Sequence, residues 1–311
     1  MKNENRKSLY GVLILIFAST IWGSAFVAQS AGMDYVGPFT FQAVRTLLGA
    51  AALIPVILIS DGIKKKKEEY TRPTAADRKR LAVAGLICGA ALFAASNLQQ
   101  IGIKYSTVAK AGFITALYIL LVPVFGIFIG RKTGLHTLFC ALIAAVGLYL
   151  ICINGAFSLS VGDLALLACA AVYSVHILII DHFAPSVDNL KLSFLQMIVA
   201  AALSALMTLI FEEPTVGALL EAKWTLLYAG VLSSGVAFTL QIVAQKMTKP
   251  SLSSLAMSLE SVFSLISGML ILRQIPTLHE GIGCAVMFAA IISAQLFEYY
   301  PPEFLRKKGK E

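Results

Sequence analysis

The stretch Asn97–Gly126, NLQQIGIKYSTVAKAGFITALYILLVPVFG, indicates most directly what kind of chain this is. One apolar run ends in the polar residues 97–100, and a second begins after a short link at 104–107. Two neighbouring helices of a soluble protein would carry charged residues along their outer faces. Neither of these runs does, so we expect both to be helices in a medium without water.

The composition extends this expectation to the whole chain. Of its 311 residues, 58% are hydrophobic and only 14% are charged, whereas roughly a quarter of the residues of a soluble domain are charged. The net charge of +8 would suggest a nucleic-acid partner in a soluble protein. Here the basic residues lie in links between apolar runs, so we expect a polytopic membrane protein and no nucleic acid.

The sequence divides into ten apolar runs of about the length that crosses a bilayer. Only helices satisfy their own backbone groups in lipid, apart from closed barrels, so the predicted fold class is all-α. The first run has no convincing cleavage site and is expected to be a retained span rather than a signal peptide. The predicted spans are 9–29, 37–60, 81–103, 108–129, 134–154, 162–182, 189–211, 222–245, 251–272 and 278–299.

The basic residues predict the orientation of these spans. With ten crossings and the N-terminus inside, 20 of the 25 Lys and Arg residues lie on the cytoplasmic side, four lie outside, and Arg45 lies within a span. Such a bias follows the positive-inside rule. We therefore expect both termini in the cytoplasm, with residues 301–311 forming a basic tail.

An internal repeat is visible at an offset of 151 residues, which aligns Gly11 and Trp22 with Gly162 and Tyr173. We expect a first five-helix repeat over residues 1–155 and a second over 156–300. Because five is odd, the second repeat would be inverted relative to the first. Inverted repeats around a site at the membrane midplane are typical of secondary transporters.

Charged and titratable residues inside a span are functional candidates, because burying them in lipid is costly. Arg45 could contact substrate or could brace a helix end, and Glu260 could bind substrate or a proton or be a fixed structural carboxylate. Counting residues along the spans places these two at similar depth, so they could pair. His176 could titrate, or it could be a hydrogen-bonded packing residue.

Four further residues complete the candidate site. Trp22 and Ser24 lie near the middle of the first span, where the indole could line a cavity or only pack. The Tyr118 phenol could face a substrate or a neighbouring carbonyl. Pro123 would interrupt the helical hydrogen bonds and is a candidate hinge. The five cysteines lie within or at the ends of apolar runs without metal-like spacing, and we expect them to pack between helices.

Four segments resemble the drug/metabolite transporter superfamily and, within it, the EamA type: Trp22–Phe26, Pro38–Arg45, Gln100–Tyr105 and Lys110–Pro123. The resemblance covers about residues 10–297. It implies ten spans in two five-helix repeats and a carrier in a bacterial cytoplasmic membrane. Such carriers move small metabolites, often amino acids or drugs and often outward, through a central cavity between the repeats.

The chain departs from the family pattern at two places. Relatives often have Glu-Pro in the ninth span, where this chain has Glu260 followed by Ser261. They often end that span with Gly-Glu, where this chain has Arg273 and Gln274. We therefore expect a kinked helix in the first repeat, at Pro123, and none at the corresponding place in the second.

The sequence as a whole predicts a secondary transporter that exports a small organic metabolite, amino acid-like or drug-like, by alternating access. The alternatives are a polytopic enzyme acting on a lipid-linked substrate and a membrane scaffold or sensor. An enzyme of that kind would need a cluster of catalytic polar groups at one interface or a large loop, and the sequence has neither. The expected partners are a small-molecule substrate, the lipid bilayer and, as a candidate coupling ion, protons. No metal or cofactor is expected.

Overall fold

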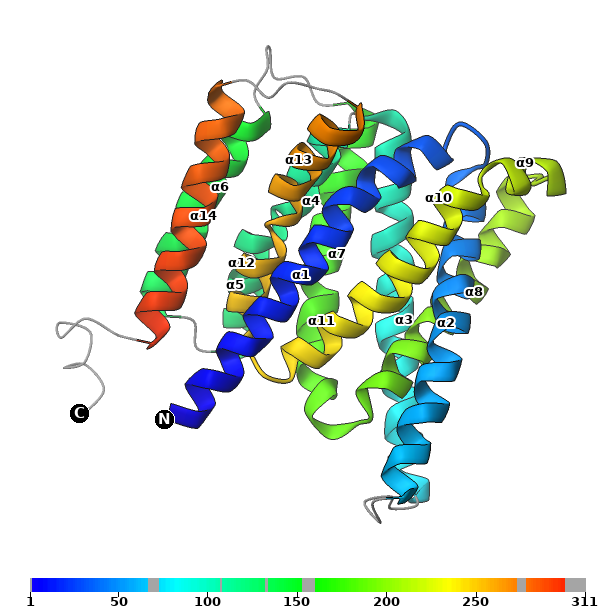
Figure 1. Cartoon of the computed structure of the whole chain (residues 1–311), viewed down its shortest axis with the longest axis horizontal. Coiled ribbons are helices and arrows are strands. Elements are labelled where there is room, and N and C mark those ends of the chain that lie inside the picture. The colour runs from blue at the N-terminus through cyan, green and yellow to red at the C-terminus, as the bar shows by residue number, and fades with distance from the viewer. Residues whose placement is uncertain are drawn as a thin grey trace.

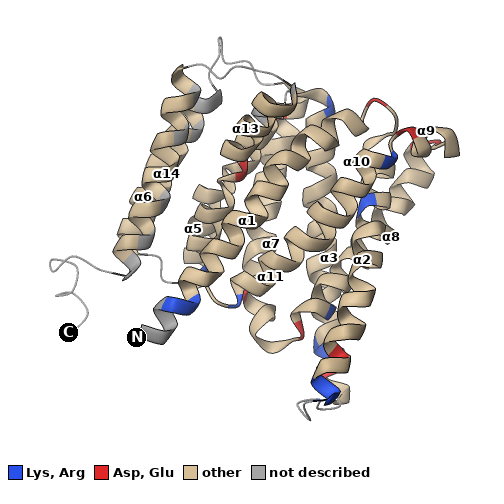
Figure 2. Cartoon of the chain, in the orientation of Figure 1, with Lys and Arg blue, Asp and Glu red and all other residues tan. Residues whose placement is uncertain are grey.

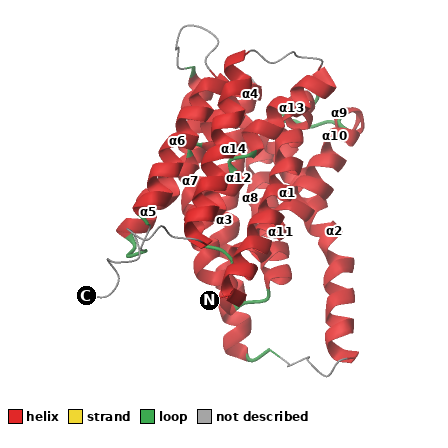
Figure 3. Ribbon diagram, turned by 60° about the vertical axis from the view of Figure 1, so that its left-hand side comes forward, coloured by secondary structure: helices red, strands yellow, loops and turns green. Residues whose placement is uncertain are grey.

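The structure, a computed structural model, describes residues 2–66, 73–106, 108–131, 134–152, 160–272 and 278–299. Within these ranges it contains helices and no strands (Figure 3). In chain order they are α1 (Lys2–Gly32), α2 (Pro38–Lys66), α3 (Ala75–Tyr105), α4 (Val108–Ala116), α5 (Tyr118–Phe128), α6 (Leu135–Cys152), α7 (Val161–Phe183), η1 (Ala184–Ser186), α8 (Asn189–Phe211), α9 (Val216–Glu221), α10 (Lys223–Leu227), η2 (Tyr228–Ala237), α11 (Phe238–Gln245), α12 (Pro250–Met257), α13 (Glu260–Leu272) and α14 (Leu278–Tyr299).

Eight helical segments in the described ranges are long and apolar enough to cross a membrane, and two shorter apolar stretches lie at Leu135–Gly147 in α6 and Gly281–Ala294 in α14. The predicted all-α, polytopic membrane fold is thereby confirmed. Ten crossings in two inverted repeats stay a prediction. Many large apolar side chains remain exposed, as expected for a surface that faces lipid.

The N-terminus and several of the links lie at one end of the bundle (Figure 1). The end of α2, the start of α3 and the α7–α8 and α11–α12 connections all lie at this end, which is the lower end in Figure 1. Charged residues gather at the two ends and are sparse along the middle (Figure 2). This is the distribution that a bilayer imposes, because its core excludes charge.

The α2 and α8 helices pack along each other and are joined at both ends. At the N-terminal end of the bundle, Lys64 Nζ lies 2.8 Å from Asp188 Oδ2, and Lys191 Nζ lies 2.9 Å from Asp61 Oδ2. Burial opposes ionisation of Asp188, but hydrogen bonds from Lys64 and the Lys191 backbone, together with both lysine charges, lower the pKa of this carboxyl.

At the opposite end of the same helix pair, the Glu212 carboxylate caps the start of α2. Its oxygens accept hydrogen bonds from the backbone N–H groups of Phe39 and Thr40, at 2.9 and 2.8 Å, and from the Thr40 hydroxyl at 2.6 Å. A carboxylate at this position satisfies free N–H groups and complements the positive end of the helix dipole. Gly37 makes room for it, since a Cβ there would lie 2.2 Å from Glu212 Cδ.

The fourth and ninth predicted spans are both interrupted near their middle. The first is broken at Leu117, between α4 and α5, and the second at Ser258 and Leu259, between α12 and α13. The expectation of a kink in the first repeat alone was therefore wrong. The second break occurs without a proline at the break. The Ser19 hydroxyl of α1 lies 3.1 Å from the carbonyl oxygens of Ala256 and Met257 there, and its single proton is shared with the Leu15 carbonyl oxygen of its own helix, at 2.8 Å.

Close packing of α1 on α13 depends on Gly23. A Cβ at this position would lie 2.5 Å from Phe263 Cβ and 2.7 Å from the Glu260 carbonyl oxygen, closer than atoms can approach. Of the cysteines, Cys88, Cys140 and Cys169 are free thiols buried between helices; the side chains of the other two lie outside the described residues.

We expect Gly23→Ala to lower stability by about 1–3 kcal/mol, because the added methyl group forces the two helices apart. The measurement is the thermal unfolding midpoint of the purified protein in detergent. Gly62→Ala is the matched control, because a Cβ at Gly62 in α2 meets nothing within 4 Å. Equal midpoints for the Gly23 and Gly62 variants would contradict the predicted contact.

Candidate functional site

A cavity in the middle of the bundle, which we call the central cavity, is enclosed by α1, α2, α3, α4, α5, α7, η2, α11, α12 and α13. It contains about 450 Å³ of empty space, including any part open to solvent. Four of the six predicted substrate-binding residues line it: Trp22, Arg45, Tyr118 and Glu260. The other lining residues are Phe26, Gln29, Gln99, Thr115, Tyr173, Ile177, Ser233, Phe238, Gln241 and Met257.

Arg45 brings a buried positive charge to this cavity from α2, with only 1% of its surface exposed. Its Nη1 donates to Gln29 Oε1 at 2.5 Å, whereas its Nε has no hydrogen-bond partner. In the described part of the chain, no carboxylate lies within ion-pair distance of this guanidinium, so the pair with Glu260 that the sequence left open is not formed. A buried guanidinium with unused donors is costly without a partner, so it can offer a binding point for an anionic group.

Glu260 and Tyr118 meet across the cavity. Each begins the second half of an interrupted span, Tyr118 at the start of α5 and Glu260 at the start of α13. The Tyr118 hydroxyl donates to Glu260 Oε1 at 2.9 Å, and both side chains are buried. This contact joins two helices that lie 142 residues apart in the sequence. The carboxyl group is thus fixed in place by a neutral donor rather than by a cation.

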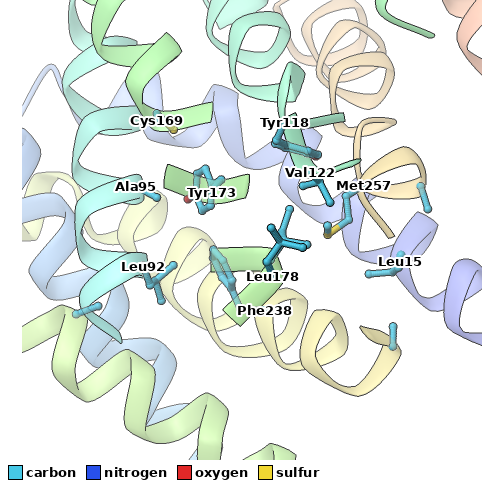
Figure 4. Packing of buried hydrophobic residues seen from close by; sticks show 14 of the residues in the cluster. Leu15, Leu92, Ala95, Tyr118, Val122, Cys169, Tyr173, Leu178, Phe238 and Met257 are labelled. Carbon is cyan, nitrogen blue, oxygen red and sulfur yellow. The ribbon is translucent and has the colours of Figure 1, made fainter. Parts of the chain in front are cut away.

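Aromatic rings form much of the remaining cavity wall, part of which is seen in Figure 4. The ring centroids of Trp22 and Phe238 lie 5.1 Å apart at an interplanar angle of 63°, an edge-to-face arrangement. Trp22 Nε1 also donates to the carbonyl oxygen of Ser233, at 3.3 Å. Ser233 lies in η2, a π-helical segment of ten residues, and π-helical distortions occur frequently at functional sites. Trp22 is therefore held in place by η2 and α11.

Three glutamine side chains add amide groups to the cavity. Gln29 bonds Arg45, Gln99 Nε2 lies 3.5 Å from Thr115 Oγ1, and Gln241 has a carbonyl oxygen without a partner. Gln99 and Gln241 lie toward the ends of their predicted spans, and the structure places both at the cavity. Gln29 and Tyr173 were missed, although both are polar groups within apolar runs and that pattern could have identified them.

Ser24 and His176 do not line the cavity. The Ser24 hydroxyl contacts the Tyr228 hydroxyl and bonds the Thr20 carbonyl oxygen of its own helix at 2.9 Å. His176 is fully buried, with Nε2 3.1 Å from Gln196 Oε1, and its ring packs on Tyr173 and Phe238. These positions fit a packing role for both residues.

We accordingly expect Ser24→Ala to change the transport KM by less than about twofold, because the lost hydrogen bonds lie behind the cavity wall. The measurement is initial flux into proteoliposomes at several substrate concentrations. A large increase in KM would show that Ser24 contacts substrate in another conformation.

Pro123 lies inside α5, five residues beyond its start, and the helix continues across it to Phe128. The interruption of the span falls earlier, at Leu117. A hinge at Pro123 stays a prediction. Among the described residues there is no group of three or more His, Cys, Asp or Glu side chains that could hold a metal ion.

Comparisons with known proteins identify relatives along almost the whole chain. The sequence profile of the EamA-like transporter family matches it twice, at residues 9–153 and 160–294. An uncharacterized transporter of Archaeoglobus fulgidus is 27% identical over 301 residues, covering 94% of this chain and 88% of that protein. The uncharacterized transporter YoaV of Bacillus subtilis is 21% identical over 287 residues, covering 90% and 93%.

A solved crystal structure has the same fold, with a TM-score of 0.73 at 23% identity over 93% of this chain and 99% of that one. The names of the relatives point to transport rather than to an enzymatic reaction.

Proposed function

Because this chain belongs to the EamA-like transporter family, we propose that it is a secondary transporter that moves a small organic solute across a membrane by alternating access around the central cavity. The observation that carries the proposal is the pair of buried ionisable side chains, Arg45 and Glu260, which line one cavity without bonding each other. Together with the aromatic wall, they could recognise an amino acid-like or drug-like molecule by opposite charges and an apolar body. The outward direction of transport rests on the family resemblance.

The two family-profile matches support two repeats, at residues 1–155 and 156–300. Helices that would correspond in the two repeats also pair in space, α2 with α8 and α6 with α14. The interruptions at Leu117 and at Ser258–Leu259 would likewise correspond. Discontinuous helices at a repeat interface are the usual place of substrate sites in secondary transporters.

The sidedness that we propose puts the N-terminus and the basic links in the cytoplasm of a bacterial cell. The sequence contains no phosphate-binding loop, so the driving force would come from a gradient or from another subunit, and we propose a gradient. Protons are the proposed coupling ion, because Glu260 is the one carboxylic acid among the described cavity-lining residues. Substrate and proton would then occupy the same cavity in alternation.

Purified protein in liposomes tests this proposal. We expect flux of at least one solute from a broad amino acid and drug panel, dependent on an imposed proton gradient and lost in protein-free liposomes. Arg45→Gln protein that shows the same chromatographic profile is the matched control, because it lacks the buried positive charge. The absence of flux over the whole panel, with correctly inserted protein, would contradict a transport function.

A further inference from the structure

A second, larger space opens at the end of the bundle that holds the N-terminus. We call it the N-terminal vestibule. It has a volume of about 2410 Å³, open solvent included, and lies between the beginning of α1, the end of α5, the start of α6, the end of α7 and the α11–α12 link. Its charged lining residues in the described part of the chain are four cations and one carboxylate, a net charge of +3. They are Lys7, Arg131, Lys246, Lys249 and Asp181.

Two of these cations, Lys7 and Lys246, have no carboxylate within ion-pair distance among the described residues. Arg131 forms an ion pair with Asp181, the one carboxylate among the described lining residues. Lys7 and Lys246 come from two other elements, the start of α1 and the end of α11, and face the same space. Both lysines line the same concave surface as the Arg131–Asp181 pair. Such a surface with low-dielectric walls focuses the electric field and raises the local concentration of anions.

The vestibule and the central cavity lie one above the other. Tyr118 and Ile177 line the cavity, while Val122 and Leu178 line the vestibule. Tyr118 and Val122 are four residues apart on α5, which is about 6 Å along a helix. Val122, Leu178 and Met257 belong to one buried apolar cluster and lie close together in Figure 4. One thin apolar layer therefore separates the vestibule from the cavity that holds Arg45.

Two deeply buried polar side chains line the inner part of the vestibule. Gln245 is 2% exposed and Thr248 is 8% exposed, and each has one side-chain oxygen without a hydrogen-bond partner. Gln245 Nε2 donates to the Ile177 carbonyl oxygen at 3.1 Å, so this side chain has only an acceptor left. The Thr248 hydroxyl can donate, as the lysine side chains nearby can. The lining thus offers donors and positive charge, the two features that an anionic oxygen group binds.

We propose that the N-terminal vestibule is a cationic entrance that selects solutes carrying an anionic oxygen group, a carboxylate or a phosphate. The proposal rests on the proposed transport function and adds the charge class of the substrate. A solute attracted into the vestibule would next meet Arg45, a second cation, after passing the apolar layer.

The test measures the electrostatic potential of the vestibule without knowledge of the substrate. A thiol is introduced by Thr248→Cys, or by Ser8→Cys should the first variant fold poorly, and native cysteines provide the background. Its reaction rates with an anionic and a cationic methanethiosulfonate are compared with those of free 2-mercaptoethanol. We expect the ratio of anionic to cationic rate to be roughly tenfold higher in the vestibule.

Neutralisation and screening complete the test. Adding Lys7→Gln and Lys246→Gln, or raising the salt concentration, should return the ratio toward that of the free thiol. Lys104→Gln, a cation in the last turn of α3, should leave it unchanged. A ratio equal to that of the free thiol, or one indifferent to the two lysine substitutions, overturns the proposal.

Protection of the same thiol distinguishes the possible ligands. Acetate and inorganic phosphate are the probes for carboxylate and phosphate solutes, and slower modification with either supports the proposal. Protection only by phosphatidylglycerol vesicles would assign the vestibule to lipid headgroups and overturn it. The thiol measurement needs no flux, so failure of transport and failure of the charge selection are observed separately.

Discussion

Arg45→Gln is expected to raise the transport KM by about 30-fold or more, since truncating one partner of a buried, hydrogen-bonded charge pair costs about 2–5 kcal/mol. The guanidinium has an unused Nε donor and one side-chain partner, Gln29. In the proposed complex these donors would bind the substrate's anionic group. The measurement is initial flux into proteoliposomes, with the chromatographic profile and melting temperature as controls for folding.

Arg45→Lys is the informative companion variant. Lysine keeps the charge but loses the planar fork that binds a carboxylate through two hydrogen bonds, so we expect an intermediate KM. Full activity of Arg45→Gln would show instead that the arginine only braces α2 against α1. Loss of folded protein in both variants would move the test to Gln29→Ala, which leaves the charge in place and removes its partner.

The second large effect is expected for Glu260→Gln. This change keeps the size of the side chain and its contact with Tyr118 but removes the titratable group. We expect the flux driven by a proton gradient to fall at least about tenfold. The flux measured without a gradient should no longer depend on pH. The measurement is flux at a series of pH values, with and without an imposed gradient.

Tyr118→Phe is the matched control for this effect, because it leaves the Glu260 carboxyl and removes one hydrogen bond to it. The loss of a single hydrogen bond amounts to about 1 kcal/mol, or roughly a fivefold change, with the pH dependence retained but displaced. Unchanged activity and an unchanged pH profile in Glu260→Gln would exclude the proton role.

The interruptions of the two spans change how the hinge hypothesis is tested. We expected only the fourth span, which contains Pro123, to be kinked. The ninth span is interrupted as well, and the break in the fourth span lies before Pro123. Ser19 offers a donor to backbone carbonyls at the second break, so a side chain from α1 can take the place of the backbone donor. If both halves bend during transport, Ser19→Ala and Pro123→Ala should impair it to a similar extent.

The fold class, an all-helical membrane protein, could be predicted from the sequence because it depends on the composition and length of the apolar runs. A bilayer core requires apolar runs of about 20 residues, and a backbone in lipid must satisfy its own hydrogen bonds, so run lengths alone indicate an all-helical membrane protein. The same counting brought Arg45 and Glu260 to similar depth, and both line the central cavity.

The lateral arrangement was decided only by the tertiary structure. Depth along a span can be counted at 1.5 Å per residue, but the face that a residue presents depends on how each helix is rotated against its neighbours. Arg45 therefore has Gln29 rather than Glu260 as its partner, and Glu260 has Tyr118. For the same reason His176 packs behind the cavity wall although its sequence position resembles that of a cavity residue.

The sequence by itself determined that this chain is a bundle of membrane helices with costly polar groups inside, because lipid constrains every residue of a span alike. Which of those groups meet was determined by side-chain packing between helices distant in the chain.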